Sequence, residues 1–134
     1  MWSVFQATTQ TVFLADHALR LPDGALEPRH GHEWTVGATV ASEALDAMDT
    51  VMDFHALEAL VEAAVGPWRG GDLNALPPFS TDGGQTLAVN PSAERVAQAI
   101  ARAIEPGLPR GVRLIEVAVG EAPGCVARFR TQPA

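Results

Sequence analysis

Two long stretches of alternating residues, separated by a turn-rich segment at residues 20–29, constrain the fold of this chain most. Within residues 2–19, alternate positions from Phe5 to His17 would share one face of an extended strand. Within residues 30–41, alternate positions from His30 to Val40 would do the same. The sequence Pro-Asp-Gly in the intervening segment is a strong turn signal. The chain is therefore predicted to begin with a long antiparallel strand pair.

The middle of the chain changes to helical periodicity. Apolar residues at helical spacing predict a helix over residues 54–65, with Asp53 as a candidate cap. A second helix is predicted to open at Asn90 and Pro91, with Asn90 as its cap. The segment between them, residues 66–91, indicates a long loop that is either functional or a flexible insertion.

The end of the chain returns to strand character. Strands are predicted over residues 112–119 and 126–130, joined by a turn at residues 121–124, with a frayed tail over residues 131–134. The predicted order is ββ-α-α-ββ in a single domain spanning residues 1–134. This order indicates an α+β fold with a four-stranded antiparallel sheet and two helices.

Composition excludes several classes of function. The formal net charge is -7, and all nine basic residues are arginines, so a nucleic-acid backbone reader is not expected. No apolar run is long enough to span a membrane, and the first residues lack the pattern of a signal peptide. The single cysteine, Cys125, cannot form an internal disulfide. A cytoplasmic protein is therefore expected.

Three of the four histidines could converge on one point. His30 and His32 are two residues apart on a predicted strand, so both imidazoles would lie on one face. His17 ends the preceding strand, and hairpin pairing could bring it beside them. Three neutral imidazoles suit a zinc ion with one coordination position left open for water or substrate. The alternative is that the two strand histidines are simply exposed.

Several motifs occur in the order found in one family. The chain resembles, over nearly its whole length, the 6-pyruvoyl-tetrahydropterin synthase and 6-carboxytetrahydropterin synthase family. The motifs are Phe13-Leu14-Ala15-Asp16-His17, His30-Gly31-His32-Glu33-Trp34, Val51-Met52-Asp53-Phe54, Leu73-Asn74, residues 90–97 and Glu121. The resemblance implies the tunnelling fold, with both helices on one sheet face. In this fold the sheets of a homotrimer close into a barrel, often stacked as a hexamer.

The resemblance also implies a ligand set and a substrate. Zinc would be held by His17, His30 and His32 and would bind the side-chain hydroxyls of 7,8-dihydroneopterin triphosphate, which acidifies the neighbouring C–H protons. Glu121 matches the glutamate expected to anchor the pterin ring, and a carboxylate can accept two parallel N–H bonds from its edge. Ser92 and Glu94 would belong to the same pocket.

The expected catalytic base differs from that of most family members. The positions at which a cysteine usually precedes His-Gly-His hold Gly24 and Leu26. Instead, Glu27-Pro28-Arg29 before His-Gly-His is similar to the subfamily in which glutamate replaces cysteine. Glu27 is therefore the expected base, and 6-hydroxymethyl-7,8-dihydropterin the expected product. The alternative product is the 6-carboxytetrahydropterin used for deazapurine (queuosine) nucleosides, but the missing cysteine counts against it.

A second departure concerns the proton relay. Relatives carry Asp-His shortly before the Leu-Asn motif, where this chain has Arg69 and Gly70. Asp72 and His55 are the nearby residues that could substitute. Losing the relay would slow proton transfer, so a catalytically impaired pterin-binding homologue is a further alternative.

Overall fold

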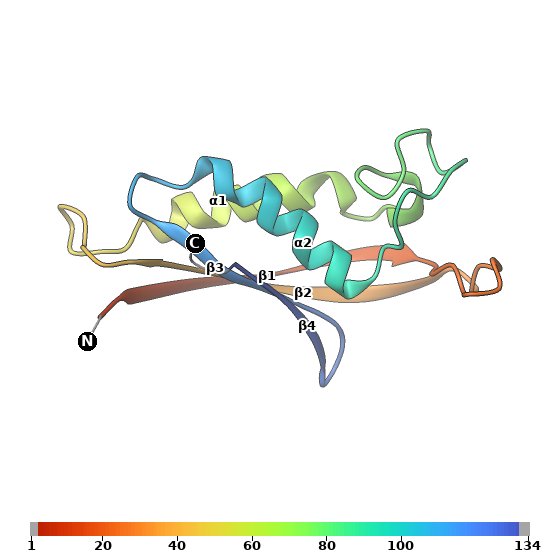
Figure 1. The fold of residues 1–134 in the computed structure, drawn as a ribbon, viewed down its shortest axis with the longest axis horizontal. Helices are drawn as coiled ribbons and strands as arrows, with labels where there is room; N and C mark the ends of the chain where they lie inside the picture. Colours follow the sequence, from red (N-terminus) through yellow and green to blue (C-terminus); the bar gives the residue numbers. More distant parts are fainter. Residues whose placement is uncertain (1–2, 132–134) are drawn as a thin grey trace.

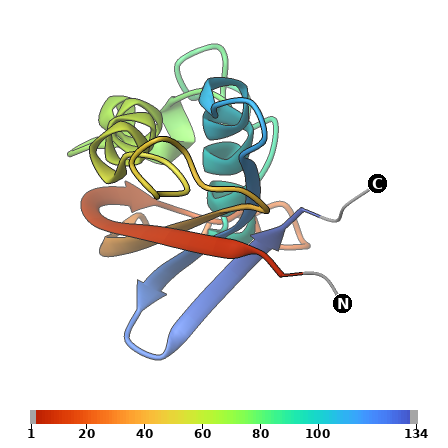
Figure 2. The same cartoon turned by 90° about the vertical axis from the view of Figure 1, so that its left-hand side faces the viewer.

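The computed structural model describes residues 3–131, and these form one twisted sheet covered on one face by two helices. The strands β1 (Phe5–His17), β2 (His30–Ser42), β3 (Arg113–Ala122) and β4 (Cys125–Arg130) are antiparallel in the order β1-β2-β3-β4. The helices α1 (Phe54–Val65) and α2 (Ala93–Ile104) lie side by side over the sheet (Figures 1 and 2). The predicted α+β class and element order are confirmed.

The β1–β2 pair has the register that the alternating sequence requires. Phe13 pairs with Trp34, and the ladder ends at His17 opposite His30. Phe13, Trp34 and His17 are all nearly fully buried on the helix-facing side of the sheet. Trp2, which falls in the predicted strand, lies outside the described residues, as do residues 132–134 of the predicted tail.

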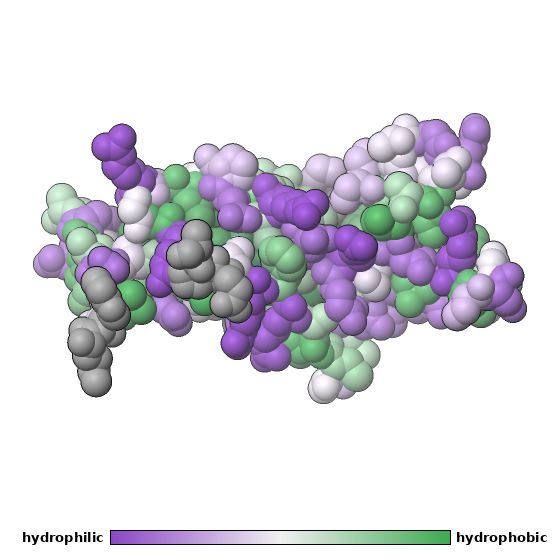
Figure 3. Space-filling view, in the orientation of Figure 1, coloured by the Kyte–Doolittle hydropathy of each residue, from purple (hydrophilic) through white to green (hydrophobic). Residues whose placement is uncertain are grey.

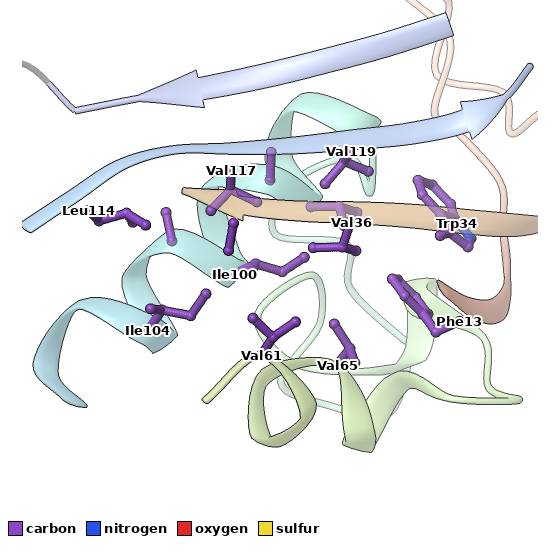
Figure 4. Close-up of a cluster of buried hydrophobic side chains, with 14 of the residues drawn as sticks. Phe13, Trp34, Val36, Val61, Val65, Ile100, Ile104, Leu114, Val117 and Val119 are labelled. Carbon is purple, nitrogen blue, oxygen red and sulfur yellow. The ribbon is translucent and has the colours of Figure 1, made fainter. Parts of the chain in front are cut away.

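The core lies between this sheet face and the apolar stripes of the two helices (Figure 4). The predicted helix 54–65 is confirmed, and Asp53 caps it by accepting from the His55 backbone N–H at 3.0 Å. Burial of each large apolar side chain contributes about 1.5–3 kcal/mol. The side chains that meet in this layer are Phe13, Trp34, Val36, Val61, Val65, Ile100, Ile104, Leu114, Val117 and Val119.

Two predicted element ends were wrong. α2 is capped by Ser92, whose Oγ accepts from the Arg95 backbone N–H at 3.2 Å, and not by Asn90. Asn90 is not available as a cap because its amide binds the backbone of Arg20. β3 continues to Ala122, so Glu121 belongs to the strand and not to the turn that follows.

The segment between the helices packs against the core. It contains two short 3₁₀ helices, Gly66–Trp68 and Leu73–Ala75, and a third, Glu105–Gly107, follows α2. Trp68, Leu73 and Phe79 from this segment are buried in the core. These anchors hold the segment over the end of the sheet where the β1–β2 loop lies.

The surface shows where apolar groups remain in contact with solvent. Hydrophilic residues run along α2 in Figure 3, and hydrophobic ones gather at the tip of the β3–β4 hairpin. On the sheet face that no helix covers, Val12, Leu14 and Val126 are between 44% and 60% exposed. Among residues 3–131, no helix is long and apolar enough to cross a membrane.

Candidate metal centre

Three histidines from two strands meet at the end of the β1–β2 ladder. One ligand atom from each of His17, His30 and His32 lies within 4.8 Å of the other two. Their ring centroids are 4.6–5.0 Å apart, with the rings steeply inclined to one another. The β alternation puts His30 and His32 on one face, and the His17–His30 register supplies the third ring. The juxtaposition predicted from the sequence is confirmed.

Hydrogen bonds to backbone carbonyls fix the tautomers of two of these rings. The Nδ1 of His17 donates to the Pro91 carbonyl at 2.7 Å, and the Nδ1 of His30 donates to the Pro28 carbonyl at 2.8 Å. A carbonyl can only accept, so in each neutral ring the Nε2 carries a lone pair. These two Nε2 atoms nevertheless face each other at 3.0 Å.

The third ring adds an unsatisfied group to the same point. The Nε2 of His32 is buried and has no hydrogen-bond partner within the described part of the chain. A buried nitrogen without a partner is costly, and facing lone pairs repel. A cation between the rings would satisfy all three nitrogens at once. The three histidines therefore fit a zinc-like ion, for which imidazole is a preferred ligand.

The surroundings of His32 favour the neutral imidazole that a metal requires. Burial is the main cause that lowers the pKa of His32, and the neighbouring His17 and His30 lower it further, against the opposing effect of Glu121 and Glu27. Trp34 closes the core side of the cluster, with its ring centroid 4.9 Å from that of His17. The Trp34 indole N–H is held by the Ala15 carbonyl at 3.0 Å.

Two carboxylates flank the cluster, and both were singled out from the sequence. Glu27 Oε1 lies 3.9 Å from His30 Nε2, and Glu121 Oε2 lies 3.9 Å from His17 Nε2. Both side chains are about one-third exposed, so they line the open side of the cluster. Glu121 reaches this point because a β-bulge between Gly120 and Ala122 shifts the end of β3.

The side chains of Ser92 and Glu94 make no polar contact with this cluster among the described residues. Ser92 caps α2, and Glu94 is exposed in the first helical turn. Across residues 3–131, neither side chain hydrogen-bonds or ion-pairs with the histidines or with Glu27 or Glu121. The neighbouring Pro91 carbonyl, by contrast, orients His17 directly.

Arg69 and Gly70, which occupy the positions expected to hold a proton relay, bind Glu62 and the backbone of β1. The Arg69 guanidinium binds Glu62 at 2.7 and 3.2 Å and donates to the Val12 carbonyl at 3.0 Å. The Gly70 N–H donates to the Leu14 carbonyl at 2.7 Å, and the next residue accepts from the Asp16 N–H. This segment, residues 69–71, covers the outer edge of β1 next to His17, and we call it the edge strap.

The two candidate substitutes for the relay differ in position. Asp72 lies beside the β1–β2 loop, where its carboxylate is 3.6 Å from Arg29, and both line a cavity of about 360 Å³ with Glu27. His55 is 89% exposed at the start of α1 and pairs only with Glu58, at 3.7 Å, among the described residues. The structure therefore brings Asp72, and not His55, to the neighbourhood of Glu27.

Sequence reasoning missed two asparagines near the centre. The side-chain amides of Asn74 and Asn90 bind the backbone of Ala18 and Arg20, directly after His17. Asn90 was interpreted as a helix cap and Asn74 only as part of a motif. No local signal identifies such contacts, because 56 and 70 residues separate the partners.

Comparisons with known proteins agree with the observed fold. The family model described as 6-pyruvoyl tetrahydropterin synthase matches residues 6–132. The solved structure of the Caenorhabditis elegans 6-pyruvoyl tetrahydropterin synthase is similar, with a TM-score of 0.77 at 15% identity over 98% of both chains. The Plasmodium vivax enzyme has a TM-score of 0.77 at 16% identity over 98% of this chain and 99% of that one.

Two further findings complete the comparison. An uncharacterized protein from Wolinella succinogenes has a TM-score of 0.75 at 17% identity, over 97% of this chain and 99% of that one. At such identities these structures show the fold, which is the ββααββ tunnelling fold expected from the resemblance. A search of curated protein sequences found no match.

Proposed function

We propose a function on one premise, which is that this chain belongs to the 6-pyruvoyl tetrahydropterin synthase family. The proposed activity is that of a zinc-dependent lyase acting on 7,8-dihydroneopterin triphosphate, with 6-hydroxymethyl-7,8-dihydropterin as the product. The observation that carries it is the Glu27 carboxylate, 3.9 Å from the Nε2 of a candidate zinc ligand. A base at this distance from the cluster can reach a substrate bound there.

The zinc site would consist of His17, His30 and His32, with the open side toward solvent. Bound zinc would polarise substrate oxygens and so acidify neighbouring protons. The backbone carbonyls that fix His17 and His30 leave their Nε2 lone pairs free, so both nitrogens could bind the ion.

Glu27 would accept the substrate proton. Its Oε1 accepts from the Leu19 backbone N–H at 2.9 Å, which holds the carboxylate beside His30. A Plasmodium vivax synthase of the same fold has been solved as variants in which a glutamate, described as a catalytic residue, is replaced by alanine or cysteine. A glutamate base in this fold supports the subfamily that the Glu-x-x-His-Gly-His motif suggests.

Glu121 would bind the pterin ring from the other side of the cluster. Its carboxylate is one-third exposed and lies 3.9 Å from His17, so it can accept paired N–H bonds from a planar guanidine-like edge. Ser92 and Glu94 are candidates for the outer pocket, and the Ser92 hydroxyl also caps α2.

The proposal includes a homo-oligomer, trimer or hexamer, in the cytoplasm. β1 and β4 are the two edges of the sheet, and open edges favour pairing with another chain. No nucleic-acid or membrane partner is proposed, in keeping with the net charge of -7.

The test is to incubate zinc-loaded protein with 7,8-dihydroneopterin triphosphate and to identify products by mass spectrometry. We expect 6-hydroxymethyl-7,8-dihydropterin from the native protein and unchanged substrate from the Glu27→Gln variant. A 6-carboxy or 6-pyruvoyl product would keep the family and overturn the proposed product.

One observation favours a second candidate, a pterin-binding homologue with impaired chemistry. The relay positions Arg69 and Gly70 belong to the edge strap, where the Arg69 guanidinium donates three hydrogen bonds. Protein that binds zinc and pterin but leaves the substrate unchanged would support this candidate over the lyase.

A further inference from the structure

We propose that Asn74 and Asn90 are positioning residues that together fix the metal ligand His17 and the candidate base Glu27 in one rigid unit. The inference rests on the proposed function for the role of those two groups. It concerns residues that lie outside the histidine cluster itself. The structural basis is the backbone of residues 18–20, which we call the clamped segment.

The clamped segment lies just beyond the end of the β1–β2 ladder. The ladder ends at His17 and His30, so residues 18–20, which follow β1, are not paired with β2. Only Arg20 forms an isolated bridge, to Leu26. Ala18 is 6% exposed, so its peptide groups cannot rely on water and need partners within the protein.

Both asparagines of the chain supply these partners. Asn74 Oδ1 accepts from the Ala18 N–H at 2.8 Å, and its Nδ2 donates to the Ala18 carbonyl at 2.7 Å. Asn90 does the same for Arg20, at 2.7 and 3.1 Å. A carboxamide has a donor and an acceptor side by side, so each asparagine reproduces the hydrogen-bonding edge of a neighbouring strand.

The residue between the two clamps holds the candidate base. The Leu19 N–H donates to Glu27 Oε1 at 2.9 Å, and the Leu19 carbonyl accepts from the Glu27 N–H at 2.9 Å. Any movement of the clamped segment would therefore move the Glu27 carboxylate. Because Oε1 is the atom that lies 3.9 Å from His30 Nε2, such movement changes the distance between base and metal site.

The metal ligand is fixed by the same two clamps. His17 directly precedes Ala18, and its Nδ1 donates to the carbonyl of Pro91, the residue after Asn90. Asn90 and Pro91 thus hold the segment at two points, and Asn74 holds it between them. Catalytic groups must be held to within about 0.5 Å by their supporting contacts, and the clamps meet that need from segments distant in the chain.

The role differs from general support of the fold, and the test separates the two. We would compare Asn74→Ala and Asn90→Ala with Asp46→Ala. Asp46 accepts three hydrogen bonds, from Met48 N–H, Thr50 N–H and the Thr50 hydroxyl, in a loop following β2. Its loss removes three hydrogen bonds, one more than either asparagine side chain makes with the clamped segment, from a loop away from the histidines. Asn90→Asp, which keeps the acceptor but loses the donor, supplies a milder variant if an alanine variant does not fold.

Zinc affinity would be measured by competition with a chromophoric chelator, and the visible spectrum of the Co²⁺-substituted protein would report ligand geometry. We expect each Asn→Ala variant to bind zinc about 10–100-fold more weakly, as loss of partners around metal ligands typically does. Its cobalt bands should change, Asn90→Asp should be intermediate, and Asp46→Ala should match the native protein. With zinc saturating, the Asn variants should lose kcat more than they raise KM.

Two results would overturn the inference, and a third concerns its premise. Native zinc affinity and cobalt spectra in both asparagine variants would show that the clamps do not position the site. Equal losses in Asp46→Ala would show a general stability effect. If the His30→Ala variant kept the native zinc affinity, the metal centre itself would be wrong, which is a failure of the proposed function that these controls make visible.

Discussion

At the scale of single residues, the tautomers of the histidines decide what the cluster can bind. The carbonyls of Pro91 and Pro28 fix Nε2 lone pairs on His17 and His30, and the buried Nε2 of His32 has no hydrogen-bond partner among the described residues. Two acceptors that face each other, beside a buried nitrogen with no partner among the described residues, form a poor hydrogen-bond network and a good cation site. The spacing of the histidines alone left exposed strand residues as an alternative, whereas the structure brings a ligand atom of each ring within 4.8 Å of the others.

Replacing His32 with alanine should therefore abolish stoichiometric zinc binding. We expect about one zinc per chain in the native protein after dialysis and almost none in His32→Ala. A ligand present at one hundred times its Kd stabilises the native state by about 2.7 kcal/mol, so added zinc should raise the Tm of the native protein only. His55→Ala is the control, because His55 is 89% exposed. Full zinc occupancy in His32→Ala would contradict the ligand assignment.

Glu27→Gln tests the base without disturbing its support. The glutamine oxygen can still accept from the Leu19 N–H, so the β1–β2 loop should keep its conformation. Turnover should fall by about 10²–10⁴-fold, the range that general acid–base catalysis supplies, while zinc content and pterin binding stay native. The measurement is the rate of product formation at saturating substrate; an unchanged rate would mean that the base is elsewhere.

At the scale of elements, local pattern predicted the interiors of the strands and helices, but distant contacts decided their ends. Strand alternation and the helical stripe are set within a few residues, which explains why β1, β2 and α1 agree with the sequence. The observed cap of α2 is Ser92 and not the predicted Asn90, because Asn90 binds Arg20, 70 residues away. Glu121 was predicted in a turn, since sequence does not reveal the bulge that carries β3 to Ala122.

The same limit applies to the site. The three histidines follow from period and pairing, and Glu27 and Glu121 follow from family resemblance. The hydrogen bonds of Asn74 and Asn90 depend on how the segment between α1 and α2 packs over the sheet, and local sequence patterns do not specify that packing. The edge strap is a similar case, because a break in the expected motif gave no indication of what Arg69 would bind.

Arg69→Ala should loosen the edge strap in a pH-dependent way. Hydrogen bonding by Arg69 is the main cause that holds the pKa of Glu62 below its ordinary value of 4.5. A lowered pKa stabilises the fold above that ordinary value, and the contribution is lost as the pH falls through the folded-state pKa. Because the pair is about half exposed, we expect a loss of only about 1 kcal/mol at neutral pH.

The measurement is urea unfolding of native protein and Arg69→Ala at pH 7 and near pH 3. The difference in free energy of unfolding should be present at pH 7 and should shrink in acid. Arg102→Ala is the control, because Arg102 has no ion pair within the described residues. A difference that does not depend on pH would mean that the strap is held by the Val12 carbonyl contact rather than by Glu62.

At the scale of the whole molecule, the strap decides which part of the β1 edge is open. The outward peptide groups of Val12, Leu14 and Asp16 are engaged by residues 69–71. Residues 5–11 of the same strand have no outer neighbour among the described residues. Their length is close to that of β4, the six-residue strand at the opposite edge of the sheet. Pairing of the open part of β1 with β4 of another copy would close sheets into the proposed barrel.

Thr8→Pro should block this assembly while leaving the chain folded. Outward hydrogen bonds of Leu14 and Asp16 indicate, by strand alternation, that the Thr8 N–H also points away from β2. Proline there removes one outward donor and none of the β1–β2 ladder bonds.

Both Thr8→Pro and the control Thr8→Ala lose the 2.8 Å hydroxyl contact with Thr39, so they differ in the N–H and in the φ angle that the proline ring fixes. Light scattering should show a trimer or hexamer for the native protein and Thr8→Ala, and a monomer for Thr8→Pro. A native monomer would refute the barrel, and an assembled Thr8→Pro would refute pairing through this edge.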